Sequence, residues 1–419
     1  MNQIQIDKRV SNRGLLLNGR SIGVALFYFY IFISSLANDT VFPSTIGSLS
    51  LYLFLGYSAL YILLHKVLKI ELMTKWMFGF MTFCVISMLY SPEKGFLSNS
   101  EFYFLVVNFI LILFLSQYDL DINDVRKIGW ANVLGAGVLI LILFARGDLT
   151  GFSTSNRFGQ DLLGNSNILA SLLMQSALYA VWLLVYSANK IMHKIVLALC
   201  LAASYYGMFL SGGRKFIVIP IVFLYIILMF KKDSRGRKHM LKYTAIVIAA
   251  VAAVYYLIMN VPAFYAVIGE RLEGLFGMLN GDFAHADGSS KIRSQMIQMG
   301  MQKWFSSPLW GYGFDSFKYY NRSMTGHFYY SHNNFVELLY DLGIIGFVIY
   351  YWFYWKLFYT AWKGKTSYTP EIRSFVIGFV LSMLVFEYGA VNYAGTAFQI
   401  MFFFAYIMLK NSRIMKESI

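Results

Sequence analysis

The stretch SHNNFVELLYDLGIIGFVIYYWFYW, residues 331–355, joins a polar turn to a long apolar run. From Phe335 onward it is apolar enough to cross about 30 Å of membrane hydrocarbon as one helix. Its first turn nevertheless holds His332, Asn333 and Glu337. The stretch therefore predicts a membrane helix that carries a reactive side chain at its N-terminal end.

Similar apolar runs recur along the whole chain, which is 58% hydrophobic and only 13% charged. A backbone in lipid must satisfy its own hydrogen bonds, so we expect helices here; barrel strands would be shorter and alternating. The predicted fold is an all-α polytopic membrane bundle of about 12 transmembrane helices, and residues 1–419 form a single membrane domain. The predicted spans are residues 21–37, 46–64, 73–90, 101–118, 127–145, 167–187, 191–211, 214–230, 243–260, 333–355, 372–389 and 393–409.

The formal net charge of +14 invites a nucleic-acid interpretation, but the distribution of charge opposes it. Most of the 35 Lys and Arg residues fall in alternate loops, and the densest run is KKDSRGRKHMLK at 231–242. By the positive-inside rule, these loops and both termini are cytoplasmic. We therefore expect the protein to lie in a lipid bilayer and to have no nucleic-acid partner. Cys84 and Cys200 lie inside predicted spans, so no disulfide is expected.

One external connection, residues 261–332, is much too long for a turn between bundle helices. Loops of this length inside a compact protein are functional or disordered. Aromatic residues such as Trp304 and Trp310 favour an ordered structure at the membrane interface. A shorter external loop, residues 146–165, is polar and carries Arg157.

Three further external arginines run against the positive-inside trend. Arg214 sits in SGGRKFIVIP, a tight Gly-Gly turn between two spans. Taken alone, it is more simply an arginine that reaches from a helix end to the interface. Arg271 in RLEGL and Arg293 in KIRSQMIQMG lie in the long loop, where a solvated helix face is the alternative to a functional role.

His332 has three interpretations, of which the simplest is a polar residue in the first turn. The second is a metal ligand with His327 and His285 as partners. His327 and His332 do not have the i, i+4 spacing of a zinc-binding pair on a helix, and the sequence has no HExxH pattern. We therefore expect neither a metal nor another cofactor. The third is a general base. The positive end of a helix keeps imidazole neutral, and a neutral histidine near arginines suits removal of a hydroxyl proton while an anionic group leaves.

The motifs occur in an order that resembles a known superfamily. HN at 332–333, followed after nine residues by GIIG at 343–346, resembles the His-Asn…Gly-x-x-Gly signature of the O-antigen ligase and O-antigen polymerase superfamily. Its members are integral-membrane glycosyltransferases that act on lipid-linked glycans. The resemblance covers roughly residues 150–350. The other segments that resemble the superfamily are NRFGQDLLGNSN, SGGRKFIVIP, RLEGL and KIRSQMIQMGMQKWFSSPLWGYGFDSF, the last with its Pro-x-x-Gly-x-Gly turn.

The resemblance implies a donor glycan linked through pyrophosphate to undecaprenol, and a sugar hydroxyl as acceptor. Forked arginine donors, here Arg214 and Arg293, would neutralise the leaving pyrophosphate without a metal. His332 would take the acceptor proton, and attack opposite the leaving group would invert the anomeric centre. Asn333 and Glu337 would orient the imidazole or the acceptor. The remaining substrate-binding candidates are Arg157, Lys215, Arg271 and Arg322.

Three functions stay open. We favour a polymerase that joins repeat units of a surface polysaccharide, O-antigen or capsule, because an aromatic-rich and nearly neutral loop suits sugar stacking. A ligase that moves the polymer onto a lipid A-core acceptor has the same parts. A glycan transporter would use Glu387 as a proton-coupling carboxylate, although an interhelical hydrogen-bonding role is the simpler interpretation. The expected location is the bacterial cytoplasmic membrane with an extracytoplasmic site; a chain-length regulator is a further candidate partner.

Overall fold

The computed structural model describes residues 2–36, 41–66, 68–92, 99–149, 157–159, 165–231, 237–279 and 288–417. Within these ranges the regular elements are helices and no β-strand occurs. A helix occupies every segment that was predicted to span the membrane. The bundle helices are α1 (Asn2–Leu36), α2 (Ser44–His65), α3 (Leu72–Met88), α4 (Ser100–Leu115), α5 (Ile122–Ala145), α7 (Ser166–Tyr186), α8 (Ile191–Leu210), α9 (Arg214–Phe230), α10 (Arg237–Asn260), α15 (Asn334–Lys363), α16 (Pro370–Glu387) and α17 (Thr396–Glu417).

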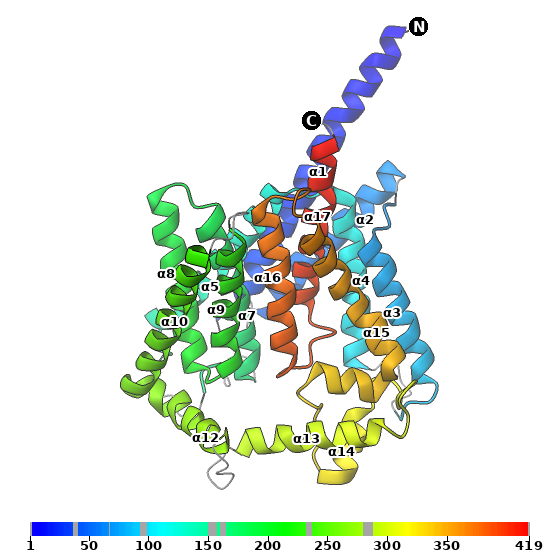
Figure 1. Ribbon diagram of the computed structural model, residues 1–419. Helices are drawn as coiled ribbons and strands as arrows, with labels where there is room; N and C mark the ends of the chain where they lie inside the picture. Colours follow the sequence, from blue (N-terminus) through cyan, green and yellow to red (C-terminus); the bar gives the residue numbers. More distant parts are fainter. Residues whose placement is uncertain are drawn as a thin grey trace.

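Eight of the described helices are long and apolar enough to cross a membrane by length and composition alone. They are α1, α2, α4, α5, α7, α8, α10 and α15. Helix α3, of 17 residues, is apolar but shorter, while α9, α16 and α17 run beside the others in the bundle (Figure 1). Large apolar side chains also cover the outside: Leu64 is 70% exposed and Leu141 and Leu199 are each 65% exposed. Such a surface suits lipid and confirms the polytopic helical membrane fold.

The connection between α10 and α15 is largely helical. It contains α11 (Pro262–Phe264), a π-helical turn η2 (Tyr265–Gly269), α12 (Glu270–Leu279), α13 (Gly288–Trp304) and α14 (Phe317–Thr325). Figure 1 shows α12, α13 and α14 lying across one end of the bundle, while both termini lie at the opposite end. The order expected from its aromatic residues is therefore present in the described part of this connection.

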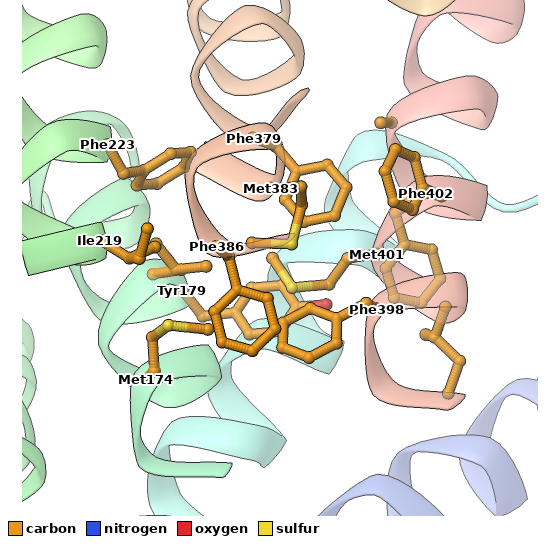
Figure 2. Close-up of a cluster of buried hydrophobic side chains, with 14 of the residues drawn as sticks. Met174, Tyr179, Ile219, Phe223, Phe379, Met383, Phe386, Phe398, Met401 and Phe402 are labelled. Carbon is orange, nitrogen blue, oxygen red and sulfur yellow. The ribbon is translucent and has the colours of Figure 1, made fainter. Parts of the chain in front are cut away.

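A dense apolar core holds the centre of the bundle between α7, α9, α16 and α17 (Figure 2). Met383 of α16 and Met401 of α17 are fully buried there, and the rings of Phe386 and Phe398 lie 5.1 Å apart. Close packing of this kind fixes helices relative to one another. Phe386 and Phe398 also line a cavity, so the same core sets the position of one cavity wall.

Candidate functional site

A cavity of about 380 Å³ lies within the end of the bundle that α12–α14 cover. It lies between the C-terminal part of α1, the N-terminal parts of α7 and α9, the connection from α16 to α17, and the segment before α15. Lys215, Arg293, Tyr330 and His332 line it. Among its described lining residues there is no Asp or Glu, and the charged side chains of this lining are basic.

His332 is held in a tight turn immediately before α15. Its φ of 58° lies in the left-handed region, which few non-glycine residues adopt. The Ser331 hydroxyl donates to the carbonyl of Asn333 at 2.8 Å and fixes this turn. Asn333 caps the helix by accepting from the backbone N–H of Val336 at 3.0 Å, and its amide donates to the carbonyl of Tyr388 at 3.0 Å. These hydrogen bonds fix the backbone of the segment that carries the imidazole, immediately before α15.

Two more side chains of the first turn of α15 secure the same segment. Glu337 is buried and its carboxylate accepts the backbone N–H of Ser331 at 2.7 Å. Asn334 accepts the backbone N–H groups of Asn392 and Tyr393 at 2.9 and 3.2 Å. These bonds join the mouth of α15 to the α16–α17 connection, which forms the facing wall of the cavity.

Burial, together with the smaller effects of the positive charges of Arg293 and Lys215, lowers the pKa of His332 to about 4. The ring is therefore neutral near pH 7 and can accept a proton. The Tyr330 ring lies 4.5 Å from the imidazole, centre to centre, and closes one side of it. Burial is thus the main reason that the imidazole is neutral, whereas the positive end of the helix was expected to be the reason.

The two basic side chains Lys215 and Arg293 of the cavity come from different elements. Lys215, at the start of α9, donates to the carbonyl of Gly389 at 2.5 Å and lies 4.8 Å from the centre of the Phe386 ring. Arg293 comes from α13, which lies across the end of the bundle. Positive charge thus reaches His332 from the bundle and from the covering helix.

Three of the other four predicted arginines lie around the Gly-Gly turn beside the cavity. Arg214 donates to the backbone carbonyl of Arg271 at 2.6 Å. Gly212 has a φ of 68°, and a Cβ built on it would lie 3.0 Å from Cδ of Arg157. None of these three arginines is among the described lining residues of the cavity. Arg322 is farther away on α14, exposed, with its guanidinium 6.0 Å from the centre of the Phe328 ring.

Gly343 breaks α15, with a φ of 64° and a ψ of −171°, and the Pro-x-x-Gly-x-Gly turn fills the break. The carbonyls of Tyr340 and Asp341, which lose their usual helical donors, accept from Tyr312 and Gly313 at 2.9 and 2.8 Å. In return, the N–H of Ile344 donates to the carbonyl of Pro308 at 2.9 Å. The two glycine motifs are thus two halves of one backbone junction.

Asp341, a residue that the sequence analysis did not select, completes this junction. Its carboxylate accepts the backbone N–H groups of Asp315, Ser316 and Phe317 at 3.0, 3.0 and 2.9 Å. It thereby caps the start of α14 from a different helix. An aspartate two residues before a glycine gave no local sign of this role.

Glu387 is fully buried and accepts hydroxyl groups of three tyrosines on α15. Tyr354, Tyr351 and Tyr350 donate at 2.5, 2.9 and 3.3 Å. Bonds of this kind join α16 to α15 and support the interhelical interpretation of Glu387 over the proton-coupling one.

The described residues contain no group of three or more His, Cys, Asp or Glu side chains that could hold a metal ion. Of the histidines considered as ligands, His327 stacks on Tyr329 with 5.6 Å between ring centres. His285 lies outside the described residues.

Sequence reasoning missed most of the amide side chains that line the deeper cavity. Asn132 of α5 and Gln175 of α7 lie inside helices that are otherwise apolar, and Asn392 lies just before α17. An amide within an apolar span is costly unless it is paired or lines a polar space, and this is the signal that could have identified the first two.

Comparison with known proteins agrees with the motifs. Residues 195–351 match the family model described as O-antigen ligase. The matched region begins in α8 and ends within α15, so it includes Arg214, Arg293 and His332. No curated protein matches the chain. The family match confirms the resemblance stated from the sequence and supports, in broad terms, a function of the ligase or polymerase type.

Proposed function

We propose, from the O-antigen ligase family match of residues 195–351, that this chain is a membrane glycosyltransferase. In this proposal it polymerises undecaprenyl-pyrophosphate-linked repeat units of a surface polysaccharide on the outer face of the bacterial cytoplasmic membrane. The observation that carries the proposal is one cavity lined by His332, Arg293 and Lys215, with no carboxylate among its described lining residues. A neutral base beside two cations suits a reaction in which a proton is lost and an anion leaves.

In the proposed step, the oxygen of an acceptor sugar hydroxyl attacks the anomeric carbon of the donor glycan. A new C–O bond forms on one face while the bond to the pyrophosphate oxygen breaks on the other, which inverts the centre. The electron pair of the broken bond stays on the pyrophosphate, where Arg293 and Lys215 stabilise it. The hydroxyl proton passes to the imidazole of His332, and no metal is assigned a role.

The other predicted residues take supporting roles. Asn333 and Glu337 hold the segment that carries His332 through its backbone. Arg214, Arg157 and Arg271 surround the turn that precedes Lys215, and we assign them to binding the outer part of the pyrophosphate-linked glycan. Arg322 is exposed on α14 and would contact glycan beyond the cavity.

The ligase reaction is the second candidate, because the matching family is described by that activity. A ligase would use the same base and the same cations, with a lipid A-core hydroxyl as the acceptor. The chemistry of the site is the same for both, so the acceptor must be distinguished by what accumulates in cells.

The deciding experiment is the analysis of undecaprenyl-linked glycans in a deletion strain, complemented with wild type or with His332→Asn. A polymerase defect leaves single repeat units on the lipid, because nothing joins them. A ligase defect leaves long chains on the same lipid, because polymerisation continues without a final acceptor. We expect single units in the deletion strain and in the His332→Asn strain. Long lipid-linked chains would replace the polymerase with the ligase, and normal glycan with His332→Asn would refute the mechanism.

A further inference from the structure

The deeper part of the cavity differs from the part around His332. Asn132 lies about 20 Å along α5 from the end of that helix at Ala145, at 1.5 Å per residue, so the cavity extends well into the bundle. The other polar lining residues are amides and hydroxyls, among them Ser35, Asn132, Ser171, Gln175 and Asn392. The basic lining residues are Lys215, Arg293 and His332.

Two of these amides are buried and incompletely paired. Asn132 is 4% exposed, and its oxygen has no hydrogen-bond partner although its nitrogen donates to the Ser35 hydroxyl at 3.3 Å. Asn392 is 8% exposed, and its side-chain nitrogen has no partner. One acceptor and one donor are therefore left unsatisfied in the lining of the same cavity. A buried polar group without a partner destabilises the fold, so its presence at a cavity indicates a ligand that pairs with it.

The chemistry of the two amides selects the class of ligand. A hydrocarbon chain cannot pair with either group, so the polyprenyl tail is a poor occupant. A phosphate offers only acceptors and would leave the Asn132 oxygen unpaired. A neutral sugar carries groups that donate and accept, and its apolar ring faces match the neighbouring Tyr30, Leu172 and Phe398.

Resting on the proposed function, we infer that the part of the cavity lined by Asn132 and Asn392 is a subsite for the first, neutral sugar of the donor, and that these two amides recognise it. The sugar is bonded directly to the pyrophosphate, so it must lie next to the cations that hold that group. Asn132 accepts a hydrogen bond from the sugar, and Asn392 donates one to it. These residues set donor specificity without taking part in bond breaking.

The test compares the binding of two lipids to purified protein: undecaprenyl pyrophosphate, and undecaprenyl pyrophosphate carrying one N-acetylglucosamine. Wild type should bind the glycosylated lipid about tenfold more tightly, as expected for two net hydrogen bonds. Asn132→Leu and Asn392→Leu should lose that preference while they keep the wild-type affinity for the bare lipid. Ser382→Ala is the matched control, because Ser382 is also buried with an unpaired oxygen but does not line the cavity.

The outcomes separate this inference from the proposed function. Wild type that binds both lipids equally, or leucine variants that keep the preference, would overturn the sugar subsite and leave the pyrophosphate site intact. Wild type that binds neither lipid would overturn both. Wild-type affinity for the bare lipid shows that a variant is folded; should a leucine variant lack it, the shorter Asn132→Ser or Asn392→Ser is used in its place.

Discussion

Gly343 and Leu309 approach so closely that a Cβ built on the glycine would lie 2.2 Å from the carbonyl oxygen of the leucine. This contact belongs to the junction in which the break in α15 exchanges backbone hydrogen bonds with the turn at 308–313. The junction sits about two and a half turns beyond Asn334, so it determines the direction of the first turns of α15. It also explains Gly311 and Gly343, because a Cβ on either one would meet the backbone of the other segment.

We predict that Gly343→Ala lowers the free energy of unfolding by at least about 2 kcal/mol, because a side chain is strained at positive φ and also meets the Leu309 carbonyl. The measurement is thermal unfolding in detergent. Gly79→Ala in α3 is the matched control, since a Cβ there meets nothing within 4 Å. Equal unfolding temperatures for the two variants would contradict the assigned role of the junction.

Some features of the fold could be predicted from the sequence, and others could not. The helices could be predicted because each one has its own apolar stretch of sequence. A helix lies at every predicted position, and eight of the described helices are long and apolar enough to cross a membrane. The pairing of Gly343 with the turn at 308–313 could not, because backbone hydrogen bonds between distant segments leave no periodic pattern of side chains. For the same reason Asp341 was overlooked, although it caps α14.

The site was predictable only in part. His332, Arg293 and Lys215 were selected from local motifs, and the structure brings them to one cavity. Arg214 was selected by the same reasoning, but its guanidinium donates to the Arg271 carbonyl outside the described lining. The direction of an arginine side chain at the end of a helix depends on which backbone carbonyls lie near it. Local sequence does not reveal those neighbours, so the orientation of Arg214 could not be predicted.

We predict that His332→Asn abolishes glycan transfer in membranes while the protein stays folded and inserted. Asparagine is the appropriate substitute, because it tolerates the left-handed conformation of this position whereas alanine would add strain. Transfer is measured with a lipid-linked donor, and insertion by the yield of membrane protein. The control is His327→Asn, an exposed histidine outside the described cavity lining, which should retain activity. Transfer at the wild-type rate with His332→Asn would exclude this histidine as the base.

A topology prediction follows from the positive-inside rule and from the position of α14. Ser323→Cys, exposed on α14, should react with a membrane-impermeant maleimide in intact cells, and Asn189→Cys in the turn between α7 and α8 should not. The parent protein, with Cys84 and Cys200 only, is the blank. The reverse labelling pattern would put the cavity on the cytoplasmic side.

We predict that Arg293→Lys reduces transfer well below the wild-type rate, by about tenfold or more, because lysine keeps the charge but loses the forked pair of donors that matches a phosphate. The effect should be measured as kcat and KM at saturating acceptor. Arg146→Lys, at the exposed C-terminal end of α5, provides the comparison and should stay within about twofold of wild type, since single exposed charges contribute little. If both variants behave alike, Arg293 acts only as a positive charge.

The pH dependence of the reaction should report the environment of His332. Its pKa is lowered to about 4, by burial first and by Arg293 and Lys215 in addition. A general base works in its neutral form, so activity is lost as the pH falls through its pKa. Because kcat/KM reports the free enzyme, its acid limb should lie near pH 4 and not near 6.5, the ordinary value for histidine.

Donor binding should shift the acid limb of the pH profile. A pyrophosphate beside Arg293 and Lys215 offsets the positive charges that lower the pKa of His332, so the pKa rises in the complex and the acid limb of kcat lies at higher pH than that of kcat/KM. Arg293→Gln removes one of those charges from the free enzyme. It should shift the kcat/KM limb to higher pH, whereas Arg322→Gln should leave it unchanged. A limb that does not move with Arg293→Gln would mean that the titrating group is not next to this arginine, and the base would have to be sought elsewhere.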